Sequence, residues 1–383
     1  MVKLIGDLIK DVIEPGFCLG CNACAAACPI QCIEKEENEI PVLKTGCINC
    51  GICYGQCPQV VDPKTLQKAV FGDNPTDELL GTYTQALAVE AKDAVMKAHG
   101  QDGGAVTALL SSLLDDGYID GAVVVGTGEA PWQPVARVAT TTGELIECAG
   151  SKYSRTPLFI GLRDAVNLYY RKRVAIVGTP CNIVASWRMQ FSEPTNRQLG
   201  ETIRLRVGLF CGGVFRYKEF LKDIIERQLR APLAEVAKFD MKDGRFVIYL
   251  RHKPKRELAL SAVKRYIDLP CKICSDFTAE FADISVGSAG SPHGRSTVLI
   301  RTPTGAEAFD VAKKFRKFSA VELEKVKPGI EEVRLEAKAK KGAAAKELEI
   351  MRRQKKPLPV WLQERPPEPP KETIESLKSI SQV

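Results

Sequence analysis

The sequence contains no long apolar run. Its longest strand-like apolar pieces, such as "GAVVVG" and "VAIVG", fall far short of the roughly 18 apolar residues that a membrane-spanning helix needs. The opening stretch, "MVKLIGDLIKDVIEPGF", also lacks a small-residue cleavage site and carries Asp7, Asp11 and Glu14, so it is not typical of a secretory signal peptide. We therefore expect a cytoplasmic protein that does not span a membrane itself. It could attach peripherally to a membrane complex.

The sequence also lacks a standard dinucleotide fingerprint. No G-x-G-x-x-G follows an expected strand, and "GTGEAP" fails the pattern, which disfavours a standard Rossmann site for a nicotinamide cofactor. Aromatic residues make up only 7% of the chain beside 45% hydrophobic residues, which is ordinary for a soluble globular protein. With 383 residues, the chain is longer than one average domain.

Positive charge is concentrated near the C-terminal end. Residues 311–356 hold 15 Lys or Arg against 7 Asp or Glu, a balance of +8 within a chain of net charge +7, which leaves −1 for the rest. Such a segment could contact nucleic acid or an anionic membrane surface. Because acids alternate with bases in "EEVRLEAKAKKGAAAKELEIMRRQKK", we favour a solvated helix that docks on a partner subunit, and we expect no nucleic-acid partner.

Cysteine, in contrast, is abundant, with 14 residues of which nine lie in the first 57 positions. In a reducing compartment such cysteines are more often metal ligands than disulfides. Eight of the nine form two runs of the pattern C-x2-C-x2-C-x3-C-P: Cys18, Cys21, Cys24 and Cys28, then Cys47, Cys50, Cys53 and Cys57. This pattern is typical of two-cluster bacterial ferredoxins, in which the fourth cysteine of each run binds the other cluster.

The spacing therefore predicts two 4Fe–4S clusters with crossed ligands. The first cluster is expected on Cys18, Cys21, Cys24 and Cys57, and the second on Cys47, Cys50, Cys53 and Cys28. A pair of zinc sites is the alternative, but a four-ligand zinc site has no use for this crossing. Cys32 is surplus and is expected to be a buried thiol.

A further C-x2-C pair, Cys271 and Cys274, stands alone late in the sequence. Cys181 follows "VAIVGTP" and Cys211 follows "RVGLF", so each comes just after an expected buried strand, at the edge where open α/β sheets gather ligands. These four cysteines are candidates for a third 4Fe–4S cluster, and Cys148 in "LIECAGSKY" is then the spare.

Three other interpretations of these four cysteines stay open at this point. They could hold structural zinc, they could be plain buried thiols, or Cys271 and Cys274 could form a redox dithiol. The dithiol is the weakest alternative, because "CKIC" follows Pro270 in an expected loop without a thioredoxin-like strand before it.

Strand-like and helix-like segments alternate after the cysteine runs. "YTQALAVEA", "DGAVVVG", "RVAIVGTPC" and "RLRVGLFCGG" read as strands, "GGAVTALLSSLLDDGYI", "LFIGLRDAVNLYYRK" and "KEFLKDIIERQL" as helices, and "KFDMKDGRFVIYL" as a hairpin turning at Asp243 and Gly244. We expect a mixed α/β fold with a central mixed or parallel sheet covered by helices. The expected organisation is a ferredoxin-like domain (1–63), a linker (64–81), a larger α/β domain (82–329) and a basic, helical tail that ends in a Pro-rich polyproline arm (330–383).

Five ordered motifs carry a family resemblance. At "QDGGAVTALL", "GSKYSRTP", "VGTPCN", "VGLFCGG" and "CKICSDFTAEFADISVGSAGSP", from about Tyr83 to Gly329, the chain resembles the coenzyme F420 hydrogenase/dehydrogenase beta-subunit family. The cysteine-rich start is similar to a ferredoxin module that some members carry. The resemblance implies that residues 82–329 bind FAD, one 4Fe–4S cluster and coenzyme F420, with hydride exchange between the coenzyme and the protein.

The same resemblance implies site residues. Its cluster ligands fall on Cys181, Cys211, Cys271 and Cys274. Its FAD contacts fall on Gly103, Gly104, Thr107, Ser151, Lys152, Tyr153, Thr179 and Pro180. Glycines that open a helix suit a phosphate, although a glycine pair alone is more often a turn, and a loop lysine such as Lys152 is more often solvated.

Two places depart from the family pattern. Gly212 and Gly213 follow Cys211 where relatives tend to have methionine and glutamate. His293 and Arg295 in "SPHGRS" stand where aspartate and tryptophan are common. These departures bear on the contacts with the deazaflavin and on the identity of the hydride partner.

The resemblance leads to one functional expectation. Coenzyme F420 exchanges a hydride, an FAD links two-electron to one-electron chemistry, and the clusters carry single electrons to or from a partner, in either direction. A hydrogenase, a heterodisulfide-reductase-like complex, a membrane dehydrogenase or a ferredoxin could be that partner. The alternatives are a family member that reduces a different organic substrate and a non-catalytic electron-carrier subunit, and no acid or base residue for catalysis is evident.

Overall fold

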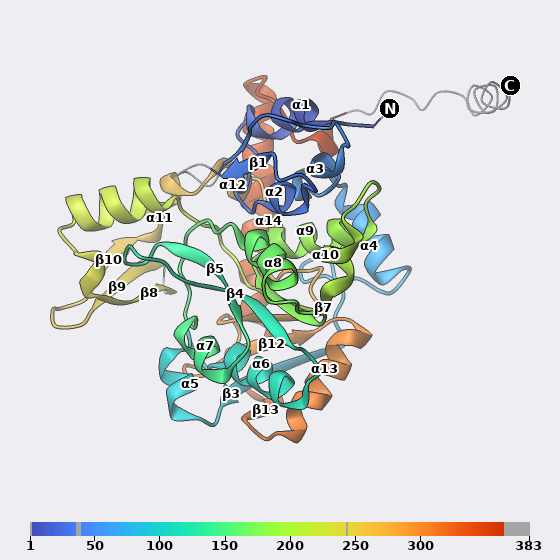
Figure 1. Cartoon of the computed structure of the whole chain (residues 1–383). Coiled ribbons are helices and arrows are strands. Elements are labelled where there is room, and N and C mark those ends of the chain that lie inside the picture. The colour runs from blue at the N-terminus through green and yellow to red at the C-terminus, as the bar shows by residue number, and fades with distance from the viewer. Residues whose placement is uncertain (1, 36–39, 243, 364–383) are drawn as a thin grey trace, which may run out of the picture.

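A mixed β-sheet forms the centre of the structure (Figure 1), a computed structural model that describes residues 2–35, 40–242 and 244–363. Within these residues the sheet has eight strands, in the order β13 (Phe318–Glu322), β3 (Gln85–Ala91), β12 (Ser296–Ile300), β11 (Ile284–Gly287), β7 (Ile203–Leu209), β6 (Val174–Gly178), β4 (Gly121–Thr127) and β5 (Pro134–Ala139). The four consecutive strands β11, β7, β6 and β4 run parallel, whereas β12, β3, β13 and β5 pair antiparallel. The expected mixed sheet is therefore confirmed, and β5 is a strand that the sequence patterns did not reveal.

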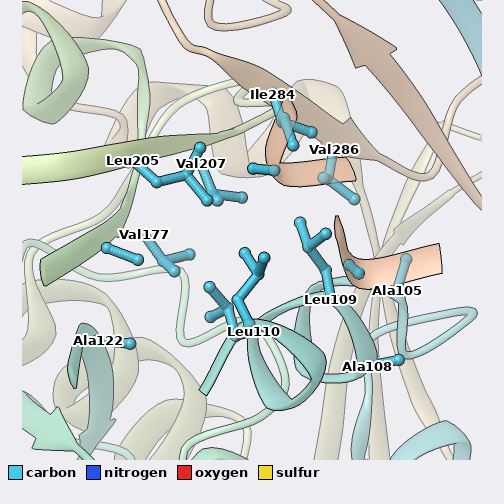
Figure 2. Packing of buried hydrophobic residues seen from close by; sticks show 14 of the residues in the cluster. Ala105, Ala108, Leu109, Leu110, Ala122, Val177, Leu205, Val207, Ile284 and Val286 are labelled. Carbon is cyan, nitrogen blue, oxygen red and sulfur yellow. The ribbon is translucent and has the colours of Figure 1, made fainter. Parts of the chain in front are cut away.

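One face of the sheet is covered by α6 (Ala105–Asp116), α13 (Pro303–Lys314), α5 (Ala94–His99) and α7 (Thr142–Glu147). Figure 2 shows Leu110 of α6 pointing toward Val177 and Val207 of the parallel strands, and Leu109 pointing toward Val286. All five side chains belong to one buried apolar cluster. Burial of such side chains, at about 25 cal/mol per Å² of apolar surface, holds the helix layer on the sheet.

The opposite face is covered by α8 (Leu158–Asn167), α9 (Pro180–Phe191) and α10 (Arg197–Thr202). Side chains alternate along a strand, so Val123 of β4 faces these helices while its neighbours Ala122 and Val124 face the first helix layer. Both faces of the parallel strands are thus buried, as in other α/β sheets.

A second, smaller sheet lies to one side of the large one (Figure 1). It pairs β8 (Val236–Lys242), β9 (Arg245–Leu250) and β10 (Arg256–Ala259) in antiparallel order, and an aromatic cluster with η3 (Tyr217–Gln228) covers it. The expected hairpin is present as β8 and β9, while Asp243 of its turn lies outside the described residues. The short elements η4 (Leu233–Glu235), α11 (Leu260–Val263), η5 (Lys264–Tyr266) and α12 (Leu269–Lys272) flank this sheet.

The cysteine-rich start consists of short elements. They are α1 (Ile5–Leu8), η1 (Ile9–Ile13), α2 (Ala23–Ala27), β1 (Ile33–Lys35), β2 (Pro41–Leu43), α3 (Ile52–Gly55) and η2 (Pro58–Val60). Helix α2 packs against α8 of the large sheet. The remaining apolar side chains of this part pack mainly around cysteines.

The stretch expected as a linker contains a helix, α4 (Pro63–Phe71). Asp62 caps it, and Leu66 and Phe71 pack against Phe281 in a buried cluster. After β13, η6 (Leu323–Lys325) precedes the long helix α14 (Ile330–Arg353), and η7 (Val360–Leu362) forms a 3-10 turn where an extended arm was expected. Residues 364–383, the rest of the expected Pro-rich arm, lie outside the described residues. None of the described helices combines the length and apolar character that a membrane crossing requires.

The buried guanidinium group of Arg301 links several chain segments at the edge of the sheet where β12 ends. Arg301 donates from Nη1 to the carbonyl oxygens of Leu80 and Thr82, both at 2.8 Å, from Nη2 to the hydroxyl of Thr278 at 2.8 Å, and from Nε to the hydroxyl of Ser285 at 2.6 Å. Its side chain is among the largest that are fully buried. Carbonyl groups buried without a donor are costly, so Arg301 stabilises three segments at once.

We expect Arg301→Met to lower the free energy of unfolding by about 3 kcal/mol, because several buried acceptors lose their donor. Urea denaturation followed by circular dichroism under anaerobic conditions measures the change. The control is Arg353→Met, since the Arg353 side chain is 78% exposed. Equal effects of the two substitutions would contradict this role of Arg301.

Candidate functional site

Two of the candidate cysteines meet at the carboxyl edge of the parallel strands. Strands β6 and β7 are neighbours in register, with Gly178 opposite Gly208 near their ends. Cys181 lies in the first turn of α9, directly after β6, and Cys211 lies two residues after β7. The topology therefore places these two strand-end cysteines on one edge, as the sequence predicted.

The C-x2-C pair reaches the same place through the loop that precedes β11. Cys271 lies in α12, and the amide of Cys274 donates to its carbonyl at 3.3 Å. The amide of Cys211 donates to the carbonyl of Phe277 at 2.8 Å, which ties the two cysteine segments together. Gly213 has a φ of 140°, and an added Cβ there would come within 2.9 Å of Ile267 and 3.6 Å of the Cβ of Cys271.

The four thiols are close enough to influence one another's ionisation. Burial raises the pKa of Cys181 to about 12, and the thiolates of Cys211 and Cys274 add to the rise. Burial likewise raises the pKa of Cys271 well above its ordinary value, with contributions from Cys211, Cys181 and Cys274. The structure thus brings together the four cysteines that sequence reasoning grouped, and we call them the third cysteine group.

A buried ion pair stabilises the loop that carries Cys271. Asp268 occupies the N-cap position of α12, and its carboxylate accepts a hydrogen bond from Nε of Arg155 and another, at 2.7 Å, from Nε of Arg216. Arg155 and Asp268 also act electrostatically on Cys18 of the first run. Because removal of one partner of a buried pair is costly, this contact holds Cys271 in place.

The first cysteine group contains three cysteines of the first run and one of the second. Cys18, Cys21, Cys24 and Cys57 line one hollow together with apolar side chains of α1 and η1. Burial raises the pKa of Cys21 far above its ordinary value, and the thiolates of Cys57 and Cys18 add to the rise. Cys57 therefore lies beside the run to which it does not belong in sequence.

The second cysteine group has the reciprocal composition. Cys28, Cys47, Cys50 and Cys53 line a second hollow. Cys32 lines it too, with its Sγ 3.5 Å from that of Cys28. The surplus thiol is buried, as expected, but it lies within this group rather than apart from it.

The three groups follow one another in space. Among the influences that raise the pKa of Cys181, after its burial, is the thiolate of Cys21 in the first group. Burial raises the pKa of Cys24 in the same way, and Cys53 of the second group contributes. The first group is therefore near both the second and the third.

In the described part of the chain, no three His, Cys, Asp or Glu side chains are placed to hold a single metal ion. The ligands of a four-iron cluster do not converge on one ion, because each thiolate binds a different iron at a corner of the cubane. The hollows of the first and second groups, lined by four and five cysteines, suit that arrangement.

Gly103 and Gly104, expected to contact FAD, open α6 at the carboxyl edge. The amide of Gly103 donates to the hydroxyl of Ser296 at 3.2 Å, and an added Cβ would come within 2.6 Å of the carbonyl oxygen of Val89. Gly104 has a φ of 67° and occupies the N-cap position. Close packing thus requires glycine at both positions, and Thr107 lies buried one turn further on.

Lys152 is not solvated. Its ammonium group donates to the carbonyl oxygens of Cys148, Ala149 and Gly150, at 2.6 to 2.9 Å, and so caps the end of α7. Burial lowers its pKa to about 8. In this structure its side chain organises the loop that carries the neighbouring candidates Ser151 and Tyr153.

That loop runs beside the third cysteine group. The amide of Phe215 donates to the carbonyl of Tyr153 at 2.9 Å, and Ser154 forms a parallel bridge with Phe215, which in turn bridges to Ile267. The amide of Ser151 donates to Gln101 at 3.1 Å, in the loop before Gly103. The candidate segments at 103–107 and 151–153 therefore lie side by side.

Thr179 and Pro180 complete the set through α9. The hydroxyl of Thr179 lies 3.2 Å from the Sγ of Cys181 and donates to the side-chain oxygen of Asn182 at 2.8 Å. Pro180 is buried at the first helical position. These two residues thus fix the turn that presents Cys181.

The family departures have different structural settings. Gly213 is required for close packing against Ile267, whereas a Cβ on Gly212 would meet no other described atom within 4 Å. Arg295 donates to the carboxylate of Glu90 at 2.6 Å, and His293 is exposed.

Sequence reasoning missed Lys340, which the charge pattern placed in a solvated tail. Its ammonium group donates to the carbonyl oxygens of Cys211 and Asp276. Burial lowers the pKa of a lysine, but the thiolates of Cys274 and Cys211 outweigh this effect and raise the pKa of Lys340. The sequence offers no signal that separates it from the other lysines of α14.

Comparison with known protein families gives two matches along the chain, both to the beta subunit of coenzyme F420 hydrogenase/dehydrogenase. Residues 86–162 match the model of its N-terminal part, and residues 171–326 match the model of its C-terminal part. The cysteine runs and α14 lie outside these two ranges.

Individual relatives extend the match. The chain is 35% identical to the coenzyme F420 hydrogenase beta subunit of Methanosarcina barkeri over 264 residues, which is 69% of this chain and 90% of the relative. It is 30% identical to an F(420)H(2) dehydrogenase subunit of Methanosarcina mazei over 335 residues, 84% of this chain and 89% of the relative. A chain of the F420-reducing [NiFe] hydrogenase complex from Methanosarcina barkeri has a similar structure, with a TM-score of 0.70, 33% identity, and coverage of 73% of this chain and 96% of that one.

Proposed function

The chain belongs to the coenzyme F420 hydrogenase/dehydrogenase beta-subunit family, and we propose that it exchanges a hydride with coenzyme F420 and passes single electrons through three 4Fe–4S clusters. A partner redox subunit or a ferredoxin takes or supplies those electrons. The observation that carries the proposal is the meeting of Cys181, Cys211, Cys271 and Cys274 beside the 151–155 segment at the carboxyl edge of the sheet.

Each cysteine group fits a four-iron cluster. The three groups supply four thiols each, drawn from separate segments of the chain and either buried or half-buried. Thiolates that repel one another in a buried site need positive charge between them, and bound iron provides it. We assign one cluster to each group, with Cys57 and Cys28 as the crossed ligands of the first and second.

The carboxyl edge is also where FAD would bind. Bound FAD would supply the link between hydride exchange and one-electron transfer. The backbone of 103–107 at the start of α6 offers helix-terminal amides for a phosphate. Lys152 shapes the adjacent loop, and Thr179 and Pro180 form the turn that presents Cys181 at this edge.

The series of cysteine groups defines a route for electrons. The third group adjoins the 151–155 segment and the first group, and the first group adjoins the second. We propose that electrons pass between the flavin site and the partner in this order, in either direction. We propose that the partner docks beside the second group, where Ile48, next to Cys47, is 61% exposed.

Anaerobically purified protein is expected to contain about twelve iron atoms and one FAD, because three four-iron clusters account for that number. It should oxidise reduced coenzyme F420, which restores the absorbance of the oxidised coenzyme, when an artificial electron acceptor is present. About eight iron atoms without flavin would contradict the proposal, since the two N-terminal clusters alone account for that number. Full cofactor content with turnover of another organic substrate only would favour the sister-enzyme alternative.

Cys274→Ser should lower the iron content by up to about four atoms per chain, because it removes a ligand of the third cluster. The matched control is Cys148→Ser, a half-buried cysteine outside the three groups, which should leave the iron content unchanged. Iron analysis and electron paramagnetic resonance (EPR) measure both variants. An unchanged iron content in Cys274→Ser would contradict the assignment.

Crossed ligation predicts which variants share a spectroscopic defect. Cys57→Ser and Cys24→Ser should alter the same EPR signal, although Cys57 belongs to the other sequence run, because both line the first hollow. Cys53→Ser should alter a different signal, since Cys53 lines the second hollow. A shared defect of Cys57→Ser and Cys53→Ser would mean that each run binds its own cluster.

A further inference from the structure

Helix α14 connects the large sheet to the cysteine-rich start. It begins at Ile330, after the last residue matched by the family comparison, and its Val333 and Ala337 are buried against the sheet with Leu80. At its other end Met351 packs in the cluster that surrounds the first and second cysteine groups. In Figure 1 the helix (red) extends from the sheet to the blue N-terminal elements.

Lys340 lies between these two ends, beside the third cysteine group. Its Nζ donates to the carbonyl oxygen of Asp276 at 2.8 Å and to that of Cys211. Cys274 lies on the same loop as Asp276, with its Sγ 3.7 Å from the Asp276 carbonyl oxygen. One ammonium group therefore joins the two segments that carry Cys211 and Cys274.

The neighbouring cations of α14 are engaged differently. Lys341 pairs with the carboxylate of Glu280 at 2.6 Å, Arg334 pairs with that of Asp77 at 2.6 Å, and Lys338 is exposed. The two hydrogen bonds of Lys340 go to neutral carbonyl groups, so they leave its charge in place. The buried carboxylate of Asp276 also attracts Lys340, and it interacts electrostatically with Lys341 and Arg301 as well.

We propose that Lys340 is a positioning residue for the third cluster: it holds the Cys211 and Cys274 segments together and raises the reduction potential of the cluster by its positive charge. The proposal rests on the assignment of a cluster to this group. Net charge and hydrogen bonds around a cluster set its potential, and a buried cation stabilises the reduced form, which carries one more electron. A higher potential makes the third cluster a better acceptor from the flavin site.

Lys340→Gln tests the electrostatic half, because the amide keeps a donor for the carbonyl groups but carries no charge. In a potentiometric EPR titration, the ratio of reduced to oxidised third cluster at a fixed potential should fall about tenfold, which corresponds to about 59 mV for one electron. Lys340→Arg should restore the ratio, and Lys341→Gln, the matched control one residue away, should leave it unchanged.

Lys340→Met tests the positioning half, because it removes both donors. Loss of the third-cluster signal in the presence of a chelator should be at least about tenfold faster than in the wild type, while the N-terminal signals persist. A Gln variant with the wild-type potential would overturn the electrostatic half, and a Met variant with wild-type retention would overturn the positioning half. A wild-type protein without a third signal would instead refute the cluster assignment itself.

Discussion

Thiol groups buried beside one another are the constraint on which the rest of the structure depends. Twelve cysteines gather in three groups of four, and burial together with neighbouring thiolates raises the pKa of members such as Cys24 and Cys271. Such an arrangement becomes favourable when positive charge joins it, and metal binding then contributes free energy to folding. Under the proposed cluster assignment, the short elements of the first 60 or so residues, which pack around cysteines, depend on this contribution most.

Much of this arrangement could be predicted from the sequence, because it follows from local rules. The C-x3-C-P spacing predicted that Cys57 and Cys28 exchange groups, and both line the expected hollows. Parallel strands end at one edge, so Cys181 and Cys211 could be paired without knowledge of the loops between them. The expected contacts with FAD remain a proposal, since Gly103 and Lys152 have packing and capping roles that their residue types do not reveal.

Contacts between segments that are distant in the sequence could not be predicted from the sequence. The acids and bases of α14 alternate as they do on a solvated helix, yet Val333 and Ala337 of this helix are buried against the sheet. Lys340 and Lys341 differ only in their tertiary contacts, because Lys340 donates to backbone carbonyl groups and Lys341 pairs with Glu280. The same limit explains why α4 was expected as a linker: its stability comes from Leu66 and Phe71 against a distant cluster rather than from a strong helix pattern. A peripheral helix, α14, thus contributes Lys340 to the third cysteine group at the edge of the central sheet.

The central claim is that the third cysteine group connects coenzyme F420 to the two N-terminal groups. Freeze-quenched EPR after anaerobic mixing with reduced coenzyme F420 tests it most directly, with wild type compared to Cys274→Ser. The account predicts that all cluster signals appear in the wild type, whereas in the variant the N-terminal clusters accept electrons from dithionite but not from the coenzyme. Equal reduction of the N-terminal clusters by the coenzyme in both proteins would contradict it.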